Sequence, residues 1–222
     1  MSRAGDPTAP AAPAAAPVAA LFTRSDGAYV FARWARPIAP VVFGVEPQSL
    51  PVLKGAIEAI AALAGHEVAE LDPELGANLM LFFVRGWDEL AETPHLDRLI
   101  PDLAALAGRL EAAEANQYRI FRFDPEGGIR AAFAFVRMDE HLSAVPAEAL
   151  ALDQAARLIL LWSDAAFVDR PPLVAGPEGA MLRPEIGDVI RAAYDPALPS
   201  AATDPAHALR LAARMGQGRR RA

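Results

Sequence analysis

The segment HEVAE at 66–70 is the nearest approach to a metal-binding motif in the sequence. It differs by its last residue from HExxH, in which two ligands one turn apart on a helix bind zinc. Gly65 is typical of a residue that ends a helix, and an Asp-Pro turn follows the segment. This leaves no room for a helix that would present His66 and Glu70 on one face. We therefore interpret their charges as belonging to a strand or turn.

A second group of reactive side chains is Asp139, Glu140 and His141, directly after a predicted strand. Two carboxyl groups beside an imidazole can supply acid–base catalysis if they share a pocket that shifts their pKa values. The other histidines, His95 and His207, lie in distant segments and are expected at the surface. Hydrolysis by scattered carboxylates and His is therefore an alternative function.

Several kinds of chemistry are absent from the sequence. It contains no Cys, which excludes disulfides, thiolate catalysis and Cys-ligated metal sites. It contains neither a GxSxG nucleophile elbow nor a Walker-type or GxGxxG glycine loop. We therefore predict neither a metal nor a cofactor.

Composition limits the partners. Lys and Arg number 21 against 28 Asp and Glu, giving a net charge of -7, which argues against broad nucleic-acid binding. No continuous apolar stretch reaches the length of about 18 residues typical of a transmembrane helix. The 53% of hydrophobic residues suffice for a sizeable core.

Hydrophobic periodicity predicts the elements that position these residues. The alternating segments 118–123 and 129–138 flank the turn sequence DPEGG and predict a hairpin. Strands are also predicted at 29–34, 38–43 and 78–84, and helices at 48–64, 96–115 with a break at Pro101, 147–162, 184–195 and 204–215. This order predicts an α/β (α+β) fold, a small mixed sheet with packed helices.

The ends of the chain differ in composition from the middle. Residues 1–20 are rich in Pro and Ala, lack the apolar core of a signal peptide, and are predicted to be disordered. Residues 216–222 form a basic tail with three consecutive arginines. We predict one globular domain between them, at 21–215.

Three pieces of sequence resemble the uncharacterised proteobacterial family catalogued as domain of unknown function 2927. They are the segment Ala77-Asn78-Leu79, the pair Ser163-Asp164 after a helix, and the segment AYDPAL at 193–198. The resemblance covers roughly residues 21–215. It implies a zincin-like architecture, because that family resembles a zincin-type metallopeptidase domain.

In zincins the helix that corresponds to 147–162 carries HExxH. Here Asp153, Gln154 and Arg157 stand in its place, and Arg157 would put a positive charge at the metal position. The resemblance therefore implies a helix that does not bind zinc. A cleft is expected around Asp153, Gln154, Arg157 and Asp164. The alternative for Asp153 and Arg157 is an ordinary ion pair one helical turn apart on a solvated face.

The leading interpretation is a non-catalytic, zincin-like binding or structural module with an unknown protein or peptide partner. The resemblance implies a periplasmic or cell-envelope location, whereas the lack of a visible signal peptide favours the cytoplasm. A third possibility is a cytoplasmic interaction protein with a Pro/Ala tether.

Overall fold

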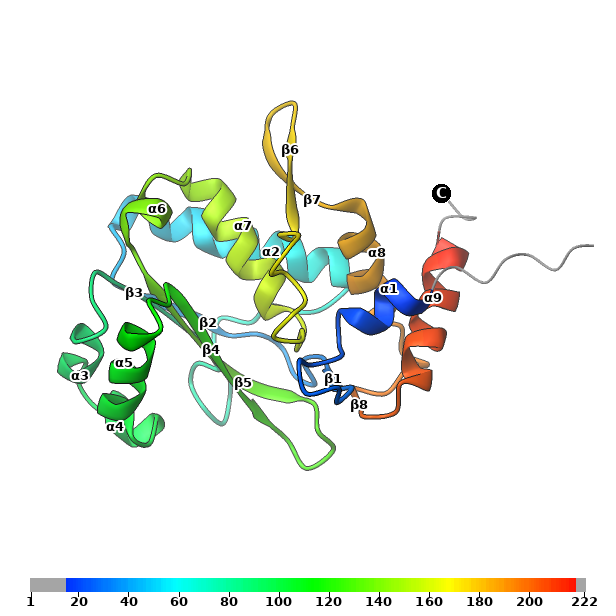
Figure 1. Ribbon diagram of the computed structural model, residues 1–222, viewed down its shortest axis with the longest axis horizontal. Helices are drawn as coiled ribbons and strands as arrows, with labels where there is room; N and C mark the ends of the chain where they lie inside the picture. Colours follow the sequence, from blue (N-terminus) through cyan, green and yellow to red (C-terminus); the bar gives the residue numbers. More distant parts are fainter. Residues whose placement is uncertain (1–14, 219–222) are drawn as a thin grey trace, which may run out of the picture.

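The computed structural model describes residues 15–218, and a mixed sheet lies at its centre (Figure 1). The strand order is β2 (Pro40–Phe43), β3 (Leu79–Val84), β5 (Ile129–Arg137) and β4 (Gln117–Phe123). The first three strands are parallel, and β4 runs antiparallel to β5 at the edge. The predicted fold class, a mixed sheet with packed helices, is confirmed.

Helices cover both faces of this sheet. On one face α2 (Leu50–Ala64) packs against α7 (Ala147–Leu158), and on the other lie α3 (Glu89–Glu92), α4 (Leu96–Leu99) and α5 (Leu103–Ala112) (Figure 1). Alternate residues of β3 divide between two hydrophobic cores: Leu79, Leu81 and Phe83 face the first, and Phe82 and Val84 the second. Burial on both faces explains why β3 is a continuous apolar run.

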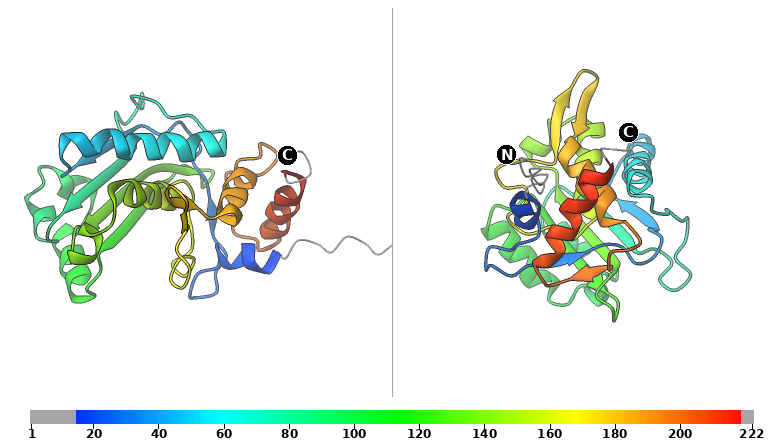
Figure 2. Two further views of the ribbon diagram at one scale, coloured as in Figure 1. Left: turned by 90° about the horizontal axis from the view of Figure 1, so that it is seen from above. Right: turned by 90° about the vertical axis from the view of Figure 1, so that its right-hand side faces the viewer.

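The elements after residue 172 pack on α7 and α2 and, with α1 (Ala15–Ala20), form one end of the molecule (Figure 2). A hairpin of β6 (Leu173–Gly176) and β7 (Gly179–Leu182) leads into α8 (Pro184–Ala193) and α9 (Ala206–Gly218), which pack together (Figure 2). Helix α1 packs on α9. The short strands β1 (Phe31–Ala32) and β8 (Ala201–Ala202) pair antiparallel, and η1 (Pro47–Ser49) and α6 (Glu140–Ser143) complete the elements.

The end of α2 settles the conformation of HEVAE. Gly65 adopts φ 65°, a left-handed conformation that suits glycine, and its N–H caps the carbonyls of Ala61 and Ala62. The helix therefore stops before His66, as predicted. The His66 Nε2 lies 2.9 Å from the Arg36 carbonyl oxygen, and burial lowers the pKa of this imidazole.

Helices cross both predicted limits of the domain. Helix α1 begins at Ala15 and buries Val18, although 15–20 were expected to be disordered. Pro17 is tolerated because it lies in the first helical turn, where N–H groups have no partner within the helix. Helix α9 continues past 215 to Gly218. The remaining parts of these predictions, residues 1–14 and the three arginines at 219–221, lie outside the described residues.

Two predictions in the second half of the chain are also wrong. Helix α7 ends at Leu158 rather than at 162, because the Leu161 N–H bonds to the Ala32 carbonyl as an extended segment begins. The Pro- and Gly-rich region 170–180, where no strand is predicted, contains most of the β6–β7 hairpin. Among residues 15–218, no helix is long and apolar enough to cross a membrane.

Candidate binding cleft

A cavity of about 580 Å³ lies beside the edge strand β4, between that strand, the end of α7 and the turn at 163–168. Its lining combines β4 residues with aromatic and charged side chains from two loops: Arg24, Ser25, Asp26, Gln117, Tyr118, Arg119, Phe121, Arg157, Leu161, Trp162, Ser163, Asp164, Phe167 and Val168. We call this cavity the β4 cleft. Its walls come from three distant segments, which the fold brings together.

The floor of the cleft is a hydrogen-bonded cluster between β4 and α7. Arg119 Nη2 donates to Gln117 Oε1 and Gln154 Oε1, each at 2.7 Å. The Gln154 amide in turn donates to Gln117 Oε1 at 3.0 Å and is fully buried. Arg119 points toward α7 because it shares the inward side of β4 with Gln117 and Phe121. We call Gln117, Arg119 and Gln154 the Arg119 cluster.

A second guanidinium lies next to this cluster. Arg157 Nε donates to Asp153 Oδ2 at 2.7 Å, an i,i+4 pair on α7, and both side chains are largely buried. The Arg157 guanidinium also lies 5.0 Å from the Phe167 ring centroid, close enough for a cation–π contact. Burial and the charge of Arg157 lower the pKa of Arg119 to about 10, although Asp153 acts in the opposite direction.

The opposite wall of the cleft is held by Asp164. Its carboxylate accepts hydrogen bonds from the backbone N–H and the hydroxyl of Ser25, 139 residues away in sequence. The hydroxyl and then the N–H of Ser25 lower the pKa of Asp164. A carboxylate with a lowered pKa is a poor base for activating the Ser25 hydroxyl, so this pair ties two loops together rather than forming a nucleophile.

Two of the four residues expected around a cleft line the β4 cleft, and the other two lie next to it. Arg157 and Asp164 line the β4 cleft, Gln154 lies beneath it in the Arg119 cluster, and Asp153 holds Arg157. Gln117 and Arg119 were not predicted. Their alternation with Tyr118 along a predicted strand was the available signal, but it does not show which edge of the hairpin is free.

The segment 139–141 has a different environment. Asp139 caps α6 by accepting the Leu142 N–H at 2.8 Å, and it also accepts a hydrogen bond from Asn116. Glu140 and His141 are exposed, and the three groups share no enclosed pocket. His207, expected at the surface, is instead buried, and its Nδ1 lies 2.9 Å from the Tyr29 hydroxyl. Among residues 15–218, no group of three His, Asp or Glu side chains is arranged to hold a metal ion.

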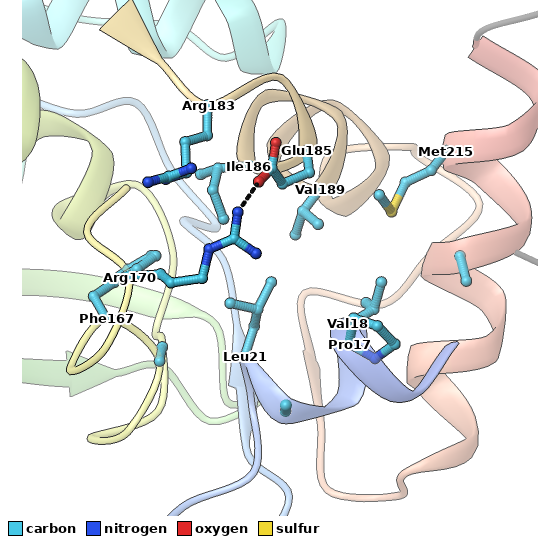
Figure 3. A pocket seen from close by; sticks show the side chains of 13 residues that line it. Pro17, Val18, Leu21, Phe167, Arg170, Arg183, Glu185, Ile186, Val189 and Met215 are labelled. Atoms are coloured by element: carbon cyan, nitrogen blue, oxygen red, sulfur yellow. Dashed lines mark hydrogen bonds and ion pairs between the residues drawn. The ribbon is translucent and has the colours of Figure 1, made fainter. Parts of the chain in front are cut away.

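Two further cavities flank the β4 cleft. One of about 920 Å³ lies between α7 and the β6–β7 hairpin and shares Arg157 with the cleft. The other, of about 480 Å³, is lined mainly by apolar side chains of α1, α8 and α9 and shares Phe167 (Figure 3). At its mouth Arg170 pairs with Glu185 at 3.2 Å, so this charge is already balanced (Figure 3).

Comparisons with known proteins found no matching family model, no matching curated protein and no matching solved structure. The geometry of the β4 cleft therefore carries the functional argument.

Proposed function

We propose that the protein is a non-catalytic, zincin-like binding module that holds an extended peptide against the free edge of β4. The observation that carries this proposal is the position of the β4 cleft directly along that edge. An edge strand presents unpaired N–H and C=O groups, and adding a peptide strand satisfies them. The zincin-like assignment itself rests on the sequence resemblance described above.

The backbone of β4 offers suitable groups on the cleft side. Arg137 N–H donates to the Asn116 carbonyl at 2.8 Å, so the backbone of Asn116 faces β5. Because antiparallel strands alternate, Tyr118 and Ile120 also turn their backbone groups toward β5. Gln117, Arg119 and Phe121 then direct theirs outward, and within residues 15–218 no strand pairs with that edge.

The usable edge is short and bounded. The pairing register of β4 shifts between Arg122 and Phe123, and such a bulge bends a strand away from regular pairing. The regular part, 117–121, matches the portion of β4 that lines the cleft. This coincidence favours a bound segment of a few residues over a long sheet-to-sheet interface.

The chemistry of the cleft favours binding over catalysis. Its acidic residues are Asp26 and Asp164, which accept hydrogen bonds from the Ala28 N–H and from Ser25 respectively. Its described lining contains no His or Glu that could act as a general acid or base. The hydrolase alternative has less support, because its three groups are not brought together: His141 lines the cavity of about 920 Å³, whereas Asp139 and Glu140 do not.

The test begins with a random octapeptide library selected on the immobilised full chain. The best peptide is then resynthesised with a single N-methyl group at each position in turn, and affinities are measured by calorimetry. Strand addition predicts that the effect of methylation alternates along the peptide with a period of two residues. Methylation of residues whose N–H faces β4 weakens binding by about tenfold or more, because one hydrogen bond is lost and the strands clash.

The intervening positions of the same peptide are the matched control, because their N–H groups face solvent and should tolerate methylation. A selected peptide whose affinity shows no alternation would overturn strand addition. Failure to select any peptide that binds in the β4 cleft would overturn peptide binding as a whole.

A further inference from the structure

Arg119 has unused hydrogen-bonding capacity in the β4 cleft. A guanidinium has five N–H donors, and both donors of Nη2 are used by Gln117 and Gln154. Nε is buried without a hydrogen-bond partner among the described residues. Nη1 also makes no hydrogen bond there, and it is not among the buried polar atoms that lack a partner, so it remains accessible where Arg119 lines the cleft.

The charge of Arg119 also lacks a counter-ion. Within residues 15–218 it forms no ion pair, and both of its hydrogen-bond acceptors are neutral amide oxygens. The nearby Asp153 is committed to Arg157 at 2.7 Å. A buried charge without a partner is costly, and a protein keeps one where a ligand or a second charge supplies the balance.

The other charges around the cleft define the missing group. Asp153 balances one of the two guanidinium charges, which leaves one positive charge between Arg119 and Arg157. At the rim, Arg24 and Asp26 are exposed and of opposite sign. Asp164, on the far wall, accepts two hydrogen bonds from Ser25. Asp164 keeps its negative charge, because Ser25 is neutral, so the three arginines and three aspartates around the cleft balance overall. The positive charge is therefore local to Arg119, and a singly charged carboxylate suits one guanidinium better than a dianionic phosphate does.

We propose that Arg119, assisted by Arg157, is the binding site for a carboxylate of the bound ligand. This inference rests on the proposed function, in which the ligand is an extended peptide. The carboxylate is the peptide's C-terminus or an Asp or Glu side chain, since both present the same two oxygens. It accepts charge-assisted hydrogen bonds from the free side of Arg119, and the neutral amides of Gln117 and Gln154 hold the guanidinium in place.

The first test needs no peptide. In protein labelled with ¹⁵N, the Nε–H of Arg119 is expected to exchange slowly enough for NMR, because it is buried. Titration with acetate is expected to shift the Arg119 Nε–H resonance saturably, whereas acetamide, of similar shape and no charge, leaves it in place. Equal shifts with both probes, or a larger response to inorganic phosphate than to acetate, would overturn the carboxylate assignment.

The second test uses the variants Arg119→Met and Arg122→Met with a selected peptide. Arg122 is the matched control, because it lies on the same strand but is exposed outside the cleft. Arg119→Met should weaken a carboxylate-bearing peptide by about tenfold to a hundredfold, the range for a charge-assisted hydrogen bond. Arg122→Met should leave its affinity within about twofold. An equal loss in both variants would contradict the proposal.

Three forms of that peptide separate the sources of the carboxylate: a free C-terminus, an amidated C-terminus, and an amidated peptide with an internal Glu. If amidation lowers the affinity and the internal Glu does not restore it, the carboxylate is the C-terminus. If the internal Glu restores the affinity, the carboxylate is a side chain. Equal affinity of all three, with the N-methyl alternation retained, would overturn the carboxylate site and leave strand addition intact. If acetate shifts the Arg119 Nε–H resonance but no peptide binds, the carboxylate site stands and strand addition is overturned.

Discussion

Two polar clusters each combine an arginine with side-chain amides but differ in how their charges are balanced. One surrounds Asp72, and the other is the Arg119 cluster. Asp72 is only 4% exposed, and its carboxylate accepts hydrogen bonds from two backbone N–H groups, from Asn78 and from Arg36. Arg119 receives only neutral partners. The first cluster is closed, whereas the second has donors to spare.

The pKa values reflect this contrast. Burial alone would raise the pKa of Asp72, but hydrogen bonds from Leu75, Glu74, Asn78 and Arg36 outweigh it and lower the pKa to about 2. For Arg119, burial is the largest cause, and it lowers the pKa to about 10 because no carboxylate is bonded to the guanidinium. Where the charge serves the fold, the chain supplies its full set of partners. Where a ligand is expected, at Arg119, the guanidinium keeps N–H donors without a partner among residues 15–218.

The largest effect is expected from opening the closed cluster. Asp72→Ala should lower the free energy of unfolding by about 3 kcal/mol, because the buried Asn78 amide and the part-buried N–H groups of Glu74 and Leu75 lose their acceptor. Chemical denaturation measures this loss. Asp97→Ala, at an exposed position, is the control and should stay within about 0.5 kcal/mol. Similar losses in the two variants would show that Asp72 does not organise the fold.

Acid should remove the stabilisation that the Asp72 carboxylate provides. The folded-state pKa of Asp72 lies below its ordinary value, so its stabilisation is fully present above about pH 4 and is lost as the pH falls toward about 2. The difference in unfolding free energy between the wild type and Asp72→Ala should therefore narrow across that window. A difference that stays constant from pH 5 to pH 2 would contradict the assigned pKa.

Alkali should affect the open cluster instead. Above a pH of about 10 the unliganded Arg119 loses its proton, so binding of a carboxylate peptide should weaken by up to about tenfold per pH unit. The amidated peptide without Glu provides the reference, and fluorescence anisotropy can follow both. Parallel weakening of the two peptides would indicate a general effect of alkali rather than titration of Arg119.

The smallest effect is expected on stability when Arg119 is removed. Arg119→Met loses two hydrogen bonds to neutral amides but also removes an unbalanced buried charge, so the free energy of unfolding should change by less than about 1 kcal/mol. Thermal and chemical denaturation of the ligand-free variant measure this change. A loss as large as that of Asp72→Ala would make Arg119 a structural residue and remove the contrast between the clusters.

Local patterns predicted much of this fold. Helix α2, the break at Pro101 and the β4–β5 hairpin follow from periodicity and turn residues, which act over a few positions. The β6–β7 hairpin was missed because its Pro and Gly residues are equally typical of a loop. Helix α1 was missed because its burial against α9 depends on residues nearly 200 positions away.

The contacts around the β4 cleft differ in how far the sequence could indicate them. Asp153 and Arg157 lie one helical turn apart, so their pairing follows from spacing alone. The approach of Gln154 to Arg119 does not, because it requires β4 to be the edge strand beside α7. The bond between Ser25 and Asp164 likewise joins distant segments, and no local pattern could have indicated it.

Amide hydrogen exchange of β4 with a selected peptide tests the central claim most directly. Tyr118 and Ile120 already direct their N–H groups to β5 and should be protected with or without the peptide. Gln117, Arg119 and Phe121 should exchange rapidly in the free protein and become protected on binding. If bound peptide leaves these three amides unprotected, or slows the exchange of Tyr118 and Ile120 as much as that of these three, the peptide does not add to the edge of β4 and the account is wrong.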